Sequence, residues 1–282
     1  MAIKKIGIVG CGVTGSAFTQ VFSQCGYEVI VSEVNEDLLN KGLALINSRL
    51  TQSVSEDKLS RQDKESILSR IKGTTDLRDF YDCDLVVEAV TEKMDVKKWV
   101  FTELDKICPQ HTIFATNTSV LSVLDMAMKT KRPEKVLGFH TNLLLGRIVE
   151  IIRTIVTNDE AIDICKTLVK SVGKTYVIAQ DTPGFIISRL TAPFFCNAIR
   201  LLEAGITTRD DIDTAMKLAI GLPFGPLAMM DLAGLDTILL GCTAIYEELK
   251  DPQYAPPTLL KKMVVAGWLG VKTGKGFYEY NQ

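Results

Sequence analysis

Short apolar runs and longer amphipathic stretches alternate along the first two thirds of the chain. The apolar runs have the length of β-strands, and hydrophobic residues between them recur at helical spacing. Strands are expected at 5–9, 28–32, 84–90, 112–116, 135–139, 147–153 and 175–179, and helices at 36–50, 95–107 and 158–172. The polar stretch 51–72 is expected to form a charged helical hairpin or to extend the preceding helix. This alternation predicts an α/β fold with a Rossmann-type doubly wound sheet.

The pattern changes at Asp181-Thr-Pro-Gly184, where proline and glycine interrupt the alternation. Beyond this point we expect only helices, at 185–204, 208–220, 227–233, 237–249 and 257–267, separated by clusters of proline and glycine. The chain is therefore predicted to form two domains, an α/β domain over 1–182 and an all-helical C-terminal domain over 183–282.

A Gly-x-Gly-x-x-Gly motif follows the first apolar run directly, and an amphipathic stretch follows the motif. In this order of strand, turn and helix, Gly10 can make the tight turn, Gly12 lets the backbone approach a pyrophosphate, and Gly15 lets the helix pack closely. The start of the helix offers free N–H groups to phosphates. The candidate cofactor contacts are therefore Gly10, Cys11, Gly12, Val13, Thr14 and Gly15.

Glu33 ends the second predicted strand, at the position where dinucleotide-binding folds carry an acid for the ribose hydroxyls. A carboxylate there accepts from the 2′-hydroxyl and repels a 2′-phosphate, and no Arg or Lys follows in the next seven residues. NAD is thus favoured over NADP. A βαβ unit that is only structural is the alternative for the same motif.

Composition narrows the function classes further. The 282 residues carry a net charge of −2, so the chain lacks the excess of basic residues that is typical of nucleic-acid-binding proteins. No apolar run reaches the length needed to cross a membrane, and the short stretch before the first strand leaves no room for a targeting peptide. Seven scattered cysteines and two histidines without ligand spacing predict free thiols in a reducing cytoplasm and no metal site.

His140 ends a predicted strand, and Glu150 lies within the apolar run that follows. Ligands of open α/β sheets bind at the carboxyl ends of the strands. A buried acid is costly unless it is paired, so Glu150 is a candidate partner that orients His140 as a general base. A purely structural histidine fits the position of His140 equally well, and Glu150 could instead face outward and pair with Arg147 or Arg153.

Three further polar residues follow predicted strands. Ser119 can cap the next helix, or it can bind a substrate oxygen or the cofactor; both roles are compatible. Glu92 and Lys97 follow the strand 84–90 and could reach a cofactor, although spacing alone favours a solvated helix end for each.

Taken together, the motifs resemble those of the short 3-hydroxyacyl-CoA dehydrogenase family, which includes bacterial 3-hydroxybutyryl-CoA dehydrogenases. The similarity covers almost the whole chain and comprises the glycine motif, Asp84-Leu-Val-Val-Glu-Ala-Val90, Thr116-Asn-Thr-Ser119, Gly138-Phe-His140, Val149-Glu150, Asp181-Thr-Pro-Gly-Phe185, Asp211-Ile-Asp-Thr-Ala-Met-Lys217, Gly221-Leu-Pro-Phe-Gly-Pro226, Asp231-Leu-Ala-Gly-Leu-Asp236 and Lys272-Thr-Gly-Lys-Gly-Phe-Tyr278.

The resemblance implies NAD-linked oxidation of a 3-hydroxyacyl thioester in fatty acid metabolism. It implies that His140 takes the hydroxyl proton, that Glu150 holds the ring, and that Ser119 lies near the reacting oxygen and the nicotinamide. Glu92, Lys97 and Lys272 match family positions that touch NAD. The helical domain would close the substrate cleft and form a homodimer.

The chain departs from the family pattern in three places. Glu150 follows His140 by ten residues instead of twelve, and Asn142 is the candidate for the family's usual cofactor-binding asparagine. Ser188 stands where the family has an asparagine that helps to bind the substrate carbonyl. Ser55 and Glu56 replace two basic residues of the helical hairpin, so that an anionic CoA nucleotide is less favoured there despite Lys58.

Three functions remain open on these grounds. The first is a dehydrogenase of a short-chain 3-hydroxyacyl-CoA such as 3-hydroxybutyryl-CoA. The second keeps NAD and the His–Glu pair but acts on a CoA-free 3-hydroxy acid. The third is an inactive paralogue that binds NAD and has a structural or regulatory role.

Overall fold

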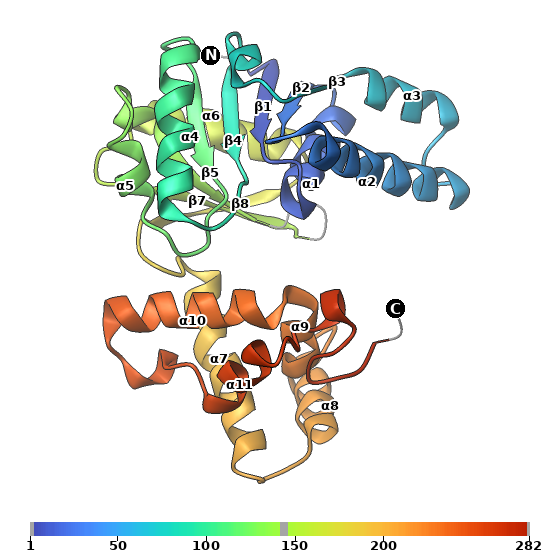
Figure 1. Ribbon diagram of the computed structural model, residues 1–282, viewed down its shortest axis with the longest axis vertical. Helices are drawn as coiled ribbons and strands as arrows, with labels where there is room; N and C mark the ends of the chain where they lie inside the picture. The colour runs from blue at the N-terminus through green and yellow to red at the C-terminus, as the bar shows by residue number, and fades with distance from the viewer. Residues whose placement is uncertain (1–2, 142–145, 281–282) are drawn as a thin grey trace. The chain divides into compact units, whose positions relative to one another are not determined.

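The computed structural model describes residues 3–141 and 146–280. The chain divides into two compact units, Met1–Asp181 and Thr182–Gln282. The first unit contains one eight-stranded sheet with strand order β3-β2-β1-β4-β5-β6-β7-β8 (Figure 1). The strands are β1 Lys5–Val9, β2 Glu28–Ser32, β3 Ile71–Thr74, β4 Leu85–Glu88, β5 Ile113–Thr116, β6 Val136–His140, β7 Ile148–Arg153 and β8 Thr175–Gln180.

The helices of the first unit connect these strands. Asn35, Ser60 and Asn158 each begin a helix by accepting a hydrogen bond from the backbone N–H three residues further on. The helices are α1 Val13–Gln24, α2 Glu36–Ser55, α3 Arg61–Ser69, α4 Met94–Ile107, α5 Val123–Ala127 and α6 Asp159–Ser171, with 3-10 turns η1 Leu77–Phe80 and η2 Pro133–Lys135.

Helices α1 and α6 contribute to the main hydrophobic core of the sheet. Ile6 and Ile8 of β1 belong to this core, and Phe18 of α1 stacks on Phe22 and packs against Phe139 of β6. Because successive side chains of a strand point to opposite faces, Gly7 faces the other side, against the ring of Phe80. With helices on the faces, the strands can be almost entirely apolar, which is why the sequence shows them as short hydrophobic runs.

The second unit is all-helical, as predicted, apart from two isolated bridges near its C-terminus within the described residues. Its core includes Ile199, Leu227 and Leu260. Buried Asp231 accepts hydrogen bonds from the backbone N–H groups of Phe277 and Tyr278, which ties the C-terminal segment to the bundle. The helices are α7 Ile187–Glu203, α8 Arg209–Ile220, α9 Pro226–Ala233, α10 Leu235–Leu249 and α11 Thr258–Val265, with η3 Pro252–Tyr254 and η4 Val271–Thr273.

The predicted α/β fold with a helical C-terminal part is thus confirmed, with three local corrections. The hairpin 51–72 forms from the end of α2 and from α3, but Ile71–Thr74 is a strand that was not predicted. The strand expected over 84–90 ends at Glu88, whose carboxylate accepts from the N–H of Val90 and turns the chain. Ser119 does not cap the next helix, because α5 begins later and Ser122 is its N-cap.

The topology brings several polar residues to one edge of the sheet. Strands β1, β4, β5 and β6 are parallel, so their carboxyl ends meet there. Glu88 lies in register with Thr116 across β4 and β5. Strand β7 runs antiparallel to β6, which places Glu150 directly opposite His140.

Candidate active site

The glycine loop between β1 and α1 has the conformation that its sequence predicts. Gly10 has φ +97°, and a Cβ there would lie 2.7 Å from the carbonyl oxygen of Ala89. A Cβ on Gly15 would lie only 1.7 Å from the carbonyl oxygen of Gly10. Gly12, by contrast, has open space beside it, with nothing within 4 Å of an added Cβ. The two outer glycines are therefore required by packing, and the middle one leaves room for a ligand.

A cavity of about 610 Å³ lies beside this loop. The carboxylate of Glu33 is fixed at the cavity wall, where it accepts from the N–H of Cys11 at 2.7 Å and from the N–H of Val34 at 3.1 Å. The remaining wall is largely apolar and suits a flat aromatic base. The cavity is lined by Val9, Gly10, Gly12, Ser32, Glu33, Val34, Thr75, Leu77, Ala89, Val90, Thr91, Val96, Trp99 and Val100.

The start of α1 completes the fit to a dinucleotide. Gly12 is the N-cap residue of α1. Because glycine has no side chain, this N-cap residue provides no side-chain acceptor for the first N–H groups of the helix. These groups attract phosphate. Cys11 contributes only its backbone, because its thiol is buried and burial raises the pKa of Cys11 to about 12. Val13 and Thr14 follow in the first turn of α1.

His140 has a hydrogen-bonding partner at each ring nitrogen. Its Nδ1 lies 2.6 Å from Oε2 of Glu150, which is fully buried, and its Nε2 lies 3.1 Å from Oγ of Ser119. Glu150 does not pair with Arg153, which binds Asp159 instead. Asn117 steadies the strand end by donating to the carbonyl oxygens of Phe139 and Thr141. The predicted contact between His140 and Glu150 is therefore present, with Ser119 beside it.

Comparison with known protein families and structures identifies the family of this chain. The model of the "3-hydroxyacyl-CoA dehydrogenase, NAD binding domain" family matches residues 5–182, and that of the corresponding C-terminal domain matches residues 184–280. The chain belongs to the 3-hydroxyacyl-CoA dehydrogenase family. It is therefore an oxidoreductase with NAD as its cofactor, and the glycine loop and cavity described above fit that cofactor.

Relatives match over the full length of the chain. A 3-hydroxybutyryl-CoA dehydrogenase of Clostridioides difficile is 39% identical over 280 residues, covering 99% of this chain and 100% of the relative. The crystal structure of M. tuberculosis FadB2 is similar with a TM-score of 0.97 at 38% identity, with both chains covered completely. The (S)-3-hydroxybutyryl-CoA dehydrogenase PaaH1 from Ralstonia eutropha gives a TM-score of 0.93 at 36% identity, again with complete coverage.

Spacing alone favours a solvated helix end for Glu92 and Lys97, but the structure does not place them at one. Lys97 is buried and its ammonium lies 2.7 Å from Glu88 and 3.2 Å from Glu92. Glu92 in turn accepts from the N–H of Ser119 at 3.1 Å and from the hydroxyl of Thr118. Sequence reasoning missed Glu88 in this group, although it is an acid within an apolar strand, the same signal that identified Glu150.

The other predicted site residues lie elsewhere. Ser188 is half-buried in the first turn of α7, and the Lys272 ammonium lies 2.7 Å from Oδ2 of Asp236; both belong to the second unit. Asn142 lies outside the described residues.

Within the described ranges, no group of three or more His, Cys, Asp or Glu could hold a metal ion. No single described helix is long and apolar enough to cross a membrane, although α9 and α10, bent by 99°, meet the criterion as a pair.

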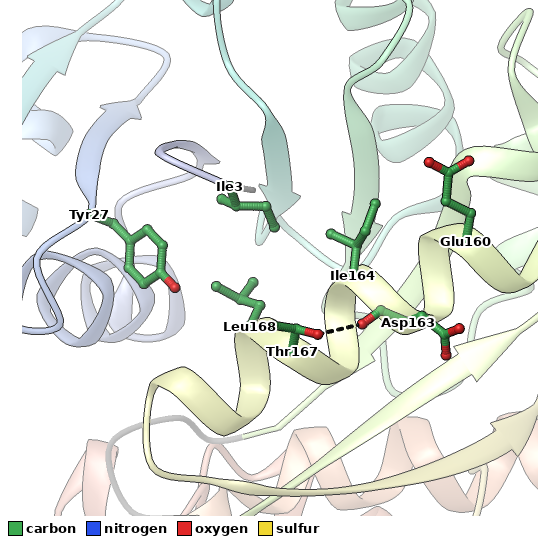
Figure 2. Close-up of a pocket in the computed structure, with 7 residues that line it drawn as sticks. All are labelled: Ile3, Tyr27, Glu160, Asp163, Ile164, Thr167 and Leu168. Carbon is green, nitrogen blue, oxygen red and sulfur yellow. Dashed lines mark hydrogen bonds between the residues drawn. The ribbon is translucent and has the colours of Figure 1, made fainter. Parts of the chain in front are cut away.

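A second cavity, of about 570 Å³, shares no described lining residue with the cofactor cavity, and Figure 2 shows the side chains that line it. Ile3, which lines it, precedes β1, so this cavity lies toward the amino ends of the strands. Among the described residues that line it, Glu160 and Asp163 are acidic and would repel an anionic substrate, and none is a histidine or a cation.

Proposed function

We propose that the protein interconverts a short-chain 3-hydroxyacyl-CoA, such as 3-hydroxybutyryl-CoA, and the corresponding 3-ketoacyl-CoA, with His140 as general base. The observation that carries the proposal is the short contact between His140 and buried Glu150 at the carboxyl edge of the sheet. Relatives named 3-hydroxybutyryl-CoA dehydrogenase support the substrate class.

The contacts of His140 support one direction of proton transfer. An ionised carboxylate only accepts hydrogen bonds, so Glu150 holds the tautomer with hydrogen on Nδ1. Nε2 then has its lone pair toward Ser119 and can accept the proton of the substrate hydroxyl. Bound NAD would supply the acceptor for the hydride that leaves the carbon bearing this hydroxyl. Glu150 would stabilise the imidazolium that forms, and Ser119, whose Oγ lies 3.1 Å from Nε2, would bind the reacting oxygen.

The remaining contacts to cofactor and substrate are proposed from family positions and the geometry above. Ser188 would bind the substrate carbonyl, with a shorter reach than the family's asparagine. Contacts to NAD are proposed for Gly10, Cys11, Gly12, Val13, Thr14, Gly15, Glu33, Glu92, Lys97, Ser119, Asn142 and Lys272.

The end of α2 favours a second candidate, a CoA-free 3-hydroxy acid as substrate. Glu56 occupies this tip, and its carboxylate pairs with Lys58 at 2.6 Å and accepts from Gln52. Lys58 therefore neutralises Glu56 instead of adding a net positive charge. A CoA phosphate would gain little electrostatic attraction at this point.

Initial rates of NADH oxidation with acetoacetyl-CoA and with free acetoacetate test the two substrates. We expect rapid turnover of the thioester. Turnover of the free acid alone would select the second candidate, and bound NADH without turnover of either would indicate an inactive paralogue.

The same assay with NADPH should be much slower, because the Glu33 carboxylate would face the added phosphate.

We also propose that the protein is a homodimer in the cytoplasm. Leu218 and Ile220 at the end of α8 and Phe224 just after it are 81%, 60% and 51% exposed, and such apolar side chains are suited to an interface. The free cysteines are consistent with a reducing compartment. Light scattering should give twice the 31.1 kDa mass of one chain; a monomer mass at micromolar concentration would contradict the dimer.

A further inference from the structure

A buried group of charges lies next to the proposed reaction centre. Glu88 at the end of β4 is fully buried, and Lys97 of α4 is 1% exposed. The Glu88 carboxylate accepts three hydrogen bonds, each of 2.7 Å, from the ammonium of Lys97, the hydroxyl of Thr116 and the N–H of Val90. Glu88 thus has a donor from α4, from β5 and from its own loop.

Burial makes this arrangement costly. It raises the pKa of the Glu88 carboxyl above its usual value, against the opposing effect of Lys97. Buried ion pairs often stabilise a fold no more than apolar side chains of similar volume would. The stability of the fold is therefore a weak reason for a charged side chain at position 88. The residues around Glu88 indicate a stronger reason.

An unbroken series of contacts leads from Glu88 to His140. Lys97 joins Glu88 to Glu92, and Glu92 accepts from the backbone N–H of Ser119. Oγ of Ser119 lies 3.1 Å from Nε2 of His140, the nitrogen that receives the proton. Every group in this series is thereby fixed by another, and Glu88 is the end that is anchored in the sheet.

We propose that Glu88 is a positioning residue for the reaction, which acts through Lys97 and Glu92 to hold Ser119 in place beside His140. This inference rests on the proposed role of His140. Glu88 is fully buried and does not line the cofactor cavity. Its effect is to restrict Glu92, and hence the Ser119 loop, to one arrangement. Small displacements of such groups can slow catalysis by about 10²-fold.

Glu88→Gln tests the proposal because the amide keeps the size and one acceptor of the side chain but removes its charge. We expect kcat to fall by about 10²-fold. Asp105→Asn is the matched control, since Asp105 lies on α4, the helix that carries Lys97, and forms a buried pair with Arg132 at 2.8 Å. Asp105 lies eight residues beyond Lys97, about 12 Å along the helix. The control should lower the melting temperature and leave kcat unchanged.

A double-mutant cycle separates positioning from general stability. If Glu88 acts through Ser119, Glu88→Gln should slow the Ser119→Ala enzyme by less than about threefold. An equal slowing of wild type and Ser119→Ala would overturn the proposal, as would wild-type kcat in a folded Glu88→Gln enzyme.

Should Glu88→Gln fail to fold, the Glu88→Gln/Lys97→Met double variant leaves neither charge unpaired, and it is also expected to be slow. Full activity of that variant would reject the proposed role. His140→Ala, measured in parallel, separates the two hypotheses: an active His140→Ala enzyme contradicts the proposed function, whereas an inactive one beside a fully active Glu88→Gln enzyme contradicts this inference alone.

Discussion

Replacing His140 by alanine is expected to lower kcat by about 10²- to 10⁴-fold, the range that a positioned general base contributes. The substrate hydroxyl would lose the acceptor for its proton, because Ser119 alone is too weak a base to replace Nε2. NADH affinity should stay close to that of wild type, since His140 does not line the cofactor cavity. Initial rates with acetoacetyl-CoA and a fluorescence titration with NADH measure the two effects separately.

The other histidine of the chain provides the control for this prediction. His111 is exposed and its Nε2 lies 3.2 Å from Asp84, a residue that precedes β4 and therefore lies at the opposite edge of the sheet. His111→Ala should leave kcat and NADH affinity unchanged. Near-normal turnover by His140→Ala would refute the proposed mechanism, whereas loss of NADH binding would show that His140 supports the cofactor site.

The regular first unit could be predicted because most of its strands, such as β4 and β5, are buried on both faces and therefore appear as apolar runs. Strand β3, Ile71–Thr74, could not, since it is short, contains Lys72 and Gly73, and has one neighbouring strand, β2. Its pairing with β2 depends on contacts that are distant in sequence. The hydrophobic pattern along the chain does not record such contacts.

The site residues also differ in whether the local sequence or only distant contacts reveal them. Glu150 could be proposed as a partner of His140 because an acid among Ile148, Val149 and Ile151 needs one. The antiparallel register that places it opposite His140 became visible only in the structure. Lys97 was misjudged on spacing because its partners, Glu88 and Glu92, come from the preceding strand and loop, and helix position alone does not show that a lysine is buried.

Glu150→Gln is the second change with a large expected effect, a fall in kcat of about 10³-fold or more. Glutamine preserves the size of the side chain in its fully buried position on β7. It removes the charge that stabilises the imidazolium. If its amide nitrogen faced Nδ1, it would also favour the tautomer with hydrogen on Nε2, which cannot accept the substrate proton.

Glu150→Asp separates charge from shape in this prediction. Aspartate keeps the negative charge but is one methylene shorter than the side chain that now reaches Nδ1 at 2.6 Å. If the charge matters most, Glu150→Asp should be faster than Glu150→Gln, although both should bind NADH normally and unfold at similar temperatures. An unchanged kcat in Glu150→Gln would mean that Glu150 only fills its place between β6 and β8, and that His140 accepts the proton without a counter-charge.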